Sequence, residues 1–157
     1  MTGRSRTMDG WAEARPAQWR RGLLVLGALV TLFGVLHHVD HVVRGNHSGW
    51  PFKEAVTPFT FSLLIYALLL PGIYMNLWGR VAAGWWLCTA AVALALVSFV
   101  HFLSGEEREA PMRDIYWVYD SPVWGALALV VLYGLVISLV ALVVAAFRAV
   151  VASRRRA

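Results

Sequence analysis

Four long apolar blocks constrain this chain more than any other feature. They cover residues 22–43, 58–76, 81–103 and 122–147. A helix needs about 20 mainly apolar residues to cross a hydrocarbon layer of roughly 30 Å, and each block approaches or exceeds that length. Backbone N–H and C=O groups cannot stay unpaired in lipid, so blocks of this kind must be helical. We therefore predict an all-α integral membrane bundle of four transmembrane helices, arranged up-down-up-down.

Composition supports a membrane protein. The chain is 59% hydrophobic and only 15% charged, whereas soluble domains average about 45–50% apolar and 25% charged residues. The net charge of +5 comes almost wholly from arginine, and cationic residues beside apolar helices usually report topology. We therefore expect the lipid bilayer, and not nucleic acid, as the partner. Cys88 is the single cysteine, which excludes an internal disulfide and a cysteine-based metal motif.

Arginine placement divides the chain and predicts its orientation. We expect a basic cytoplasmic N-terminal arm over residues 1–21, the four-helix transmembrane domain over 22–147 and a basic cytoplasmic tail over 148–157. The turn near Arg80 falls on the same side as both basic ends. By the positive-inside rule, both N- and C-termini are then cytoplasmic and the two longer loops lie outside. The predicted localisation is the cell membrane, as a multi-pass protein.

Histidine is concentrated at the end of the first apolar block. Four of the five histidines lie between positions 37 and 47, and the fifth is His101. Ionisable groups at membrane depth are costly and usually mark a functional site. At 1.5 Å per residue, His37 and His41 lie about 22 and 28 Å along the first predicted helix, and His101 about 30 Å along the third. Because these two helices run in the same direction, we expect all three histidines at similar depth in the outer half of the bilayer.

Helical spacing sorts these residues by face. His37, Asp40 and His41 share one face through i, i+3 and i+4 spacing, whereas His38 is turned about 100° away. A charged Asp40 should face the bundle interior and turn His37 and His41 inward with it. We predict an outward-facing His/Asp cluster whose metal ligands are His37, Asp40, His41 and His101. Imidazole with a carboxylate or water suits zinc, copper or iron. The bound metal would serve sensing, handling or catalysis. The sequence does not decide whether the protein is an enzyme.

Other interpretations of the histidines stand beside the metal site. A b-type haem for electron transfer fits His37 or His41 facing His101, although two axial ligands leave His38 and His47 unused. A His/Asp cluster near a membrane face can also relay protons. In a non-catalytic scaffold or accessory subunit the histidines would have no function of their own, and Asp40 would only pair with Arg44 at i+4. The H-H-x-x-H string resembles a histidine box of membrane di-iron desaturases and hydroxylases, but five histidines cannot fill two such iron sites.

Aromatic residues in the second outer loop are the remaining candidate for function. Tyr116, Trp117 and Tyr119 form a patch just before the fourth block. Such a patch can dock a protein partner through the outer loops. It fits equally well as part of the aromatic belt that anchors membrane proteins at the interface.

Overall fold

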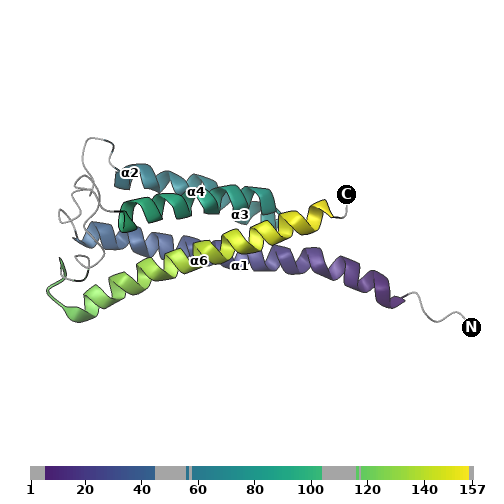
Figure 1. Cartoon of the computed structure of the whole chain (residues 1–157), viewed down its shortest axis with the longest axis horizontal. Coiled ribbons are helices and arrows are strands. Elements are labelled where there is room, and N and C mark those ends of the chain that lie inside the picture. Colours follow the sequence, from purple (N-terminus) through teal and green to yellow (C-terminus); the bar gives the residue numbers. More distant parts are fainter. Residues whose placement is uncertain (1–5, 45–55, 57, 104–115, 117, 156–157) are drawn as a thin grey trace, which may run out of the picture.

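The computed structural model confirms the predicted all-α fold class (Figure 1). It describes residues 6–44, 56, 58–103, 116 and 118–155, and side chains from Gln18 onward with the exception of Pro58. The helices are α1 (Arg6–Arg44), α2 (Pro58–Ser62), the 3₁₀ turn η2 (Leu63–Ile65), α3 (Tyr66–Leu77), α4 (Ala83–Phe102) and α6 (Pro122–Arg154). Together α2, η2 and α3 make the second membrane-length segment. None of the described residues forms a strand.

Four segments are long and apolar enough to cross a membrane. They are Gln18–Arg44, Phe59–Leu77, Ala83–Phe102 and Pro122–Arg154. These segments overlap the four predicted spans, but two helices are longer than the apolar blocks. α1 already begins at Arg6, within the predicted basic arm, and α6 continues to Arg154, within the predicted tail. Alanine, glutamine, glutamate and arginine in these extensions are good helix formers and allow the membrane helices to continue beyond the apolar region.

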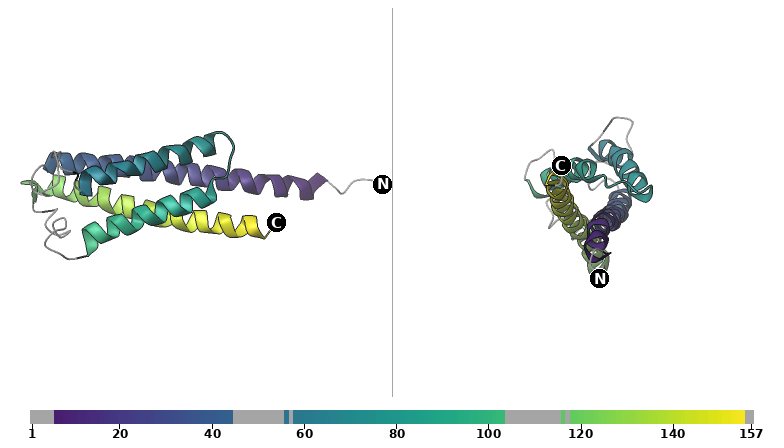
Figure 2. Two further views of the ribbon diagram at one scale, coloured as in Figure 1. Left: turned by 90° about the horizontal axis from the view of Figure 1, so that it is seen from above. Right: turned by 90° about the vertical axis from the view of Figure 1, so that its right-hand side faces the viewer.

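The helices run in alternating directions, as predicted. The start of α1, the turn between α3 and α4 and the end of α6 lie toward one end of the bundle (Figures 1 and 2). The end of α1, the start of α2, the end of α4 and the start of α6 lie toward the other. α6 packs along both α1 and α4, α3 packs on α1, and α3 and α4 contact each other far less. Which end faces the cytoplasm stays a prediction.

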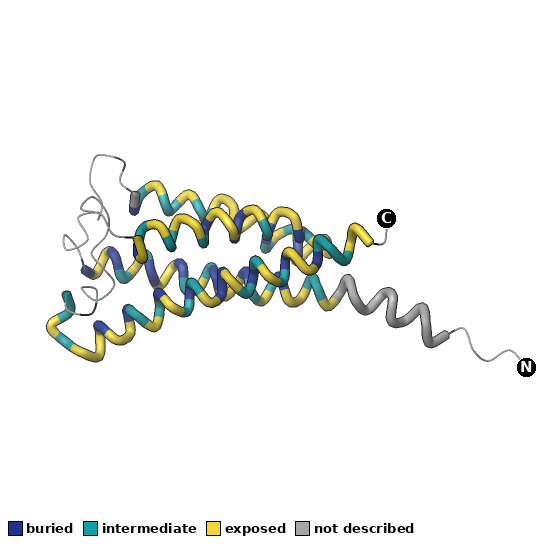
Figure 3. The backbone as a smooth tube through the Cα atoms, in the orientation of Figure 1, coloured by how far each residue is buried: buried dark blue, intermediate teal, exposed yellow. Residues whose placement is uncertain are grey.

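Exposed positions follow one another along the outside of the bundle (Figure 3), and many of them carry large apolar side chains. Large aliphatic side chains that are more than half exposed occur in all four membrane-length segments, and they include Val25, Leu32, Leu70, Val92, Val130 and Ile137. Soluble monomers rarely expose contiguous apolar surface of this kind, because water solvates it poorly. Hydrocarbon solvates it well, so the surface fits a bilayer.

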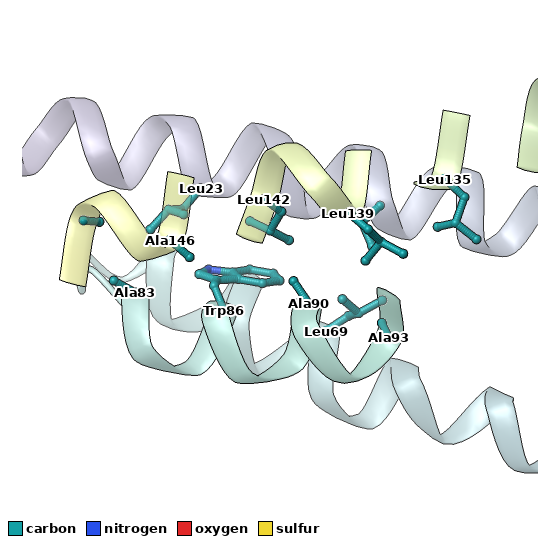
Figure 4. Close-up of a cluster of buried hydrophobic side chains, with 12 residues drawn as sticks. Leu23, Leu69, Ala83, Trp86, Ala90, Ala93, Leu135, Leu139, Leu142 and Ala146 are labelled. Carbon is teal, nitrogen blue, oxygen red and sulfur yellow. The ribbon is translucent and has the colours of Figure 1, made fainter. Parts of the chain in front are cut away.

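Trp86 belongs to the buried apolar core (Figure 4), and its ring packs against two glycines. Its side chain is fully buried. A Cβ built on Gly27 of α1 would lie 2.5 Å from Trp86 Cη2, and one on Gly72 of α3 would lie 2.8 Å from Trp86 Cζ2. The indole Nε1 lies 3.1 Å from the side-chain amide of buried Asn76, in the orientation where the amide oxygen accepts the hydrogen bond. Small residues therefore allow three helices to close around one large ring, as is common in membrane bundles.

Substituting Gly27 tests this packing. Gly27→Ala should destabilise the protein by about 1–3 kcal/mol, because an overpacked core forces side chains off their preferred positions. Trp86 has little room to move, since a Cβ on Gly72 would also lie only 2.8 Å from its ring. Gly22→Ala is the matched control, because a Cβ there meets nothing within 4 Å. Unfolding of the purified protein by sodium dodecyl sulfate measures both; equal stability of the two variants would contradict the packing argument.

Candidate metal centre

Three of the four predicted ligands meet inside the bundle. α1 places His37 and His41 one turn apart near its end, and His101 lies in the last turn of α4. All three are buried, with 5%, 4% and 6% of their surface exposed, respectively. The three histidines therefore meet at one level of the bundle, and their depth in the outer half of a bilayer stays a prediction. We refer to His37, His41 and His101 as the histidine cluster.

The ring nitrogens of the histidine cluster lie close enough to share one ion. His37 Nε2 is 3.1 Å from His101 Nε2 and 3.2 Å from His41 Nε2. One ring nitrogen from each residue lies within 4.8 Å of the other two. Metal–nitrogen bonds of about 2.0–2.1 Å in tetrahedral geometry separate two ligand nitrogens by about 3.3–3.4 Å. Small ring rotations would thus close the three nitrogens around a metal; binding itself stays a prediction.

Hydrogen bonding explains this geometry less completely. A neutral imidazole has one N–H donor and one acceptor nitrogen, each with a single in-plane direction. His37 Nε2 faces two other Nε2 atoms at similar distances, so a well-aligned hydrogen bond to one neighbour leaves the other poorly aligned. A single cation accepts the lone pairs of all three nitrogens at once. The donor set therefore fits a metal ion.

Asp40 lies outside this group of ligand atoms. Its Oδ2 accepts a hydrogen bond from Arg44 Nε at 2.9 Å and lies 2.9 Å from Arg44 Nη2. Its Oδ1 accepts a hydrogen bond from the hydroxyl of Tyr119. The pairing of Asp40 with a cation at i+4, one of the alternatives from the sequence, is therefore present. In this structure Asp40 pairs with Arg44 and Tyr119, whereas the predicted ligands that meet are His37, His41 and His101.

Tyr119 precedes α6 and is tied to α1 through Asp40. Burial raises the pKa of the Tyr119 hydroxyl above its ordinary value, and the hydrogen bond to Asp40 raises this pKa further. Both effects keep the phenol protonated and able to donate to the carboxylate. In the sequence Tyr119 belongs to an aromatic patch, and its pairing with Asp40 was not predicted. A carboxylate at membrane depth needs several hydrogen-bond donors. This need was the one sequence signal that could have pointed to a tyrosine hydroxyl as a partner of Asp40.

His38 has a different set of neighbours. Its Nδ1 lies 2.8 Å from the Gly34 carbonyl oxygen and 2.8 Å from the Tyr66 hydroxyl, and its Nε2 lies 2.8 Å from Ser62 Oγ. His38 therefore links α1 to the second segment, on a face other than that of the histidine cluster, as its 100° offset predicts. His47 and Trp117 lie outside the described residues, so their predicted roles stay predictions.

A cavity of about 140 Å³ adjoins the histidine cluster. All four membrane-length segments contribute to its walls, and His37, His41 and His101 all line it. The remaining walls are mainly aliphatic. Two lining residues, Phe61 of α2 and Leu96 of α4, are 54% and 40% exposed on the outer surface. The cavity therefore extends from the three histidines toward the lipid-facing side of the bundle.

No protein-family model, curated protein or solved structure matches this chain. The geometry of the histidine cluster and the cavity therefore indicates the chemistry. Three nitrogen ligands leave a fourth coordination position open, an arrangement that metalloproteins use where a metal must contact water or a substrate. Because the same three histidines line the cavity, a fourth ligand has space there.

Proposed function

We propose that this protein is a multi-pass protein of the cell membrane, with both termini in the cytoplasm, that binds one transition-metal ion through the histidine cluster. The observation that carries the proposal is the approach of His37 and His101 to 3.1 Å across a sequence separation of 64 residues. Burying imidazoles in a membrane bundle is costly unless they are bonded. Zinc, copper and iron are the metals that accept such ligands.

An open coordination position distinguishes catalytic metal sites from structural ones. Purely structural zinc sites are closed by four protein ligands, whereas catalytic sites keep one position for water or substrate. The three histidines provide the open type, and Asp40 is held by Arg44 and Tyr119. We propose that the metal exchanges its fourth ligand during sensing, handling or catalysis.

Haem is less compatible with the same geometry. Axial nitrogens on opposite sides of one iron are about 4 Å apart, twice the metal–nitrogen bond length, compared with 3.1 Å between His37 and His101. Sites for ligands of drug size or larger usually have volumes of about 300–1,000 Å³, and the cavity beside the cluster has about 140 Å³. A single ion needs rotation of the three rings but no space for a macrocycle.

Metal analysis of the purified protein tests the proposal. The full chain, carrying an affinity tag without histidine, is loaded separately with zinc, copper or ferrous iron, and bound metal is measured by mass spectrometry. We expect one ion per chain for at least one of these metals, with nitrogen ligands in its X-ray absorption spectrum. A His37→Ala, His41→Ala, His101→Ala triple variant should bind none.

The triple variant also provides the decisive negative outcome. Equal metal content in this variant and the unchanged chain, or no metal under any loading condition, would refute the proposal. Expression with haem supply separates the alternative: a Soret band with one haem per chain would replace the metal site with a b-type cytochrome.

A further inference from the structure

We propose that the cavity binds an uncharged, apolar ligand taken directly from the bilayer and holds it beside the open position of the metal. This inference rests on the proposed metal site, because the histidine cluster forms part of the cavity wall. It adds a substrate class, a small hydrocarbon ring or alkyl segment, and a path by which it arrives.

The size of the cavity sets the size of the ligand. The cavity measures about 140 Å³. An engineered apolar cavity of about 150 Å³ in another protein stays dry and binds benzene or xenon. A single six-membered ring, or a short segment of an alkyl chain, therefore fits without moving a helix.

The chemistry of the walls excludes a charged ligand. Apolar wall residues come from every membrane-length segment: Val30, Leu69, Ala93, Val97, Leu135 and Leu139. The polar groups of the second segment are already engaged, since Ser62 Oγ donates to the Phe59 carbonyl at 2.7 Å and also lies 2.8 Å from His38 Nε2. A charged molecule would lose its hydration and gain no compensating partner from these walls.

The position of the cavity opening indicates that the ligand comes from the bilayer and not from water. Phe61 and Leu96 line the cavity and are also exposed on the outer surface. They belong to α2 and α4, which make no extensive contact with each other within the described part of the chain. That surface faces hydrocarbon in a membrane, where apolar molecules are concentrated. The ligand therefore reaches the histidine cluster sideways, without crossing water.

A fluorinated ring and a paramagnetic metal test the inference together. The protein in lipid nanodiscs is loaded with Co²⁺, which substitutes for zinc, and titrated with benzotrifluoride. We expect a saturable increase in ¹⁹F relaxation relative to the Zn²⁺-loaded protein, because a paramagnetic ion relaxes only nuclei close to it. Ala93→Leu, which fills the cavity from α4, should weaken the apparent affinity at least tenfold.

Two further variants make the result interpretable. Ala95→Leu makes the same change two residues along α4 at an exposed position and should leave the titration unchanged. Leu96→Trp places a large side chain at the cavity opening, at an exposed position where it should not disturb folding. It should therefore weaken binding too, and it keeps the test valid if Ala93→Leu misfolds. The Co²⁺ absorption spectrum verifies that each variant retains the metal.

The possible failures are distinguishable. If Co²⁺ binds and the relaxation increase is absent, non-saturable or equal in Leu96→Trp, the apolar ligand site is refuted while the metal site stands. If Co²⁺ does not bind, the proposed metal site fails, and photolabelling of the metal-free protein by a phenyl diazirine tests the cavity alone. Labelling of cavity residues that Leu96→Trp reduces supports the ligand site; labelling equal in both proteins refutes it.

Discussion

A His37→Ala variant is expected to lose stoichiometric metal binding. His37 Nε2 is 3.1 Å from His101 Nε2 and 3.2 Å from His41 Nε2, so it is the nitrogen nearest to both others. Its removal leaves one ligand on α1 and one on α4. Substituting even a group that only orients a metal ligand typically costs about 10–100-fold in affinity, and losing the central ligand should cost more than 100-fold. Chelator competition measures the change.

His38→Ala is the matched control for His37→Ala. Both variants remove one imidazole from the same turn of α1, but His38 bonds to Ser62 and lies next to the Tyr66 hydroxyl. His38→Ala should therefore keep one metal per chain and affect only the packing of the second segment. Ligand binding to the folded state also stabilises it, by about 2.7 kcal/mol at a free metal concentration of 100 times the dissociation constant. Metal should raise the melting temperature of His38→Ala and not that of His37→Ala. The reverse pattern would show that His38, and not His37, binds the metal.

The convergence of His37, His41 and His101 could be predicted because each step uses a regular geometry. Apolar blocks define where the helices cross the bilayer. A constant rise per residue converts sequence position into depth. The 3.6-residue period then places His37 and His41 on one face and His38 on another. None of these steps requires knowledge of which helices touch.

The contacts between residues of different helices could not be predicted, because they depend on which helices touch. Hydrophobicity is similar all around a membrane helix, since lipid and core are both apolar, so sequence does not show which side meets which neighbour. The pairing of Tyr119 with Asp40 depends on how the start of α6 packs against α1. The contact of His38 with Ser62 depends on how α2 approaches α1. The cavity likewise results from side chains of four segments that fail to fill one space.

The ion pair between Asp40 and Arg44 should contribute strongly to stability despite being formed within one helix. The Arg44 and Asp40 side chains are only 1% and 9% exposed. Asp40→Ala removes the carboxylate that neutralises Arg44 and the acceptor for Tyr119. Breaking a buried ion pair by removing one partner typically costs about 3–5 kcal/mol. We expect a loss of this size in the free energy of unfolding, measured by titration with sodium dodecyl sulfate.

Replacing Asp40, Arg44 and Tyr119 together separates the cost of removing one partner from the value of the pair. A combined Asp40→Leu, Arg44→Met and Tyr119→Phe variant removes all three members of the network that the described residues form, so its stability should return to within about 1–2 kcal/mol of the unchanged chain. If Asp40→Ala alone unfolds as easily as the unchanged chain, the network contributes little. If the combined variant is as unstable as Asp40→Ala, the loss comes from packing at the end of α1. Because the proposed metal site uses only His37, His41 and His101, the combined variant should still bind one ion, whereas Asp40 as a required ligand would make it bind none.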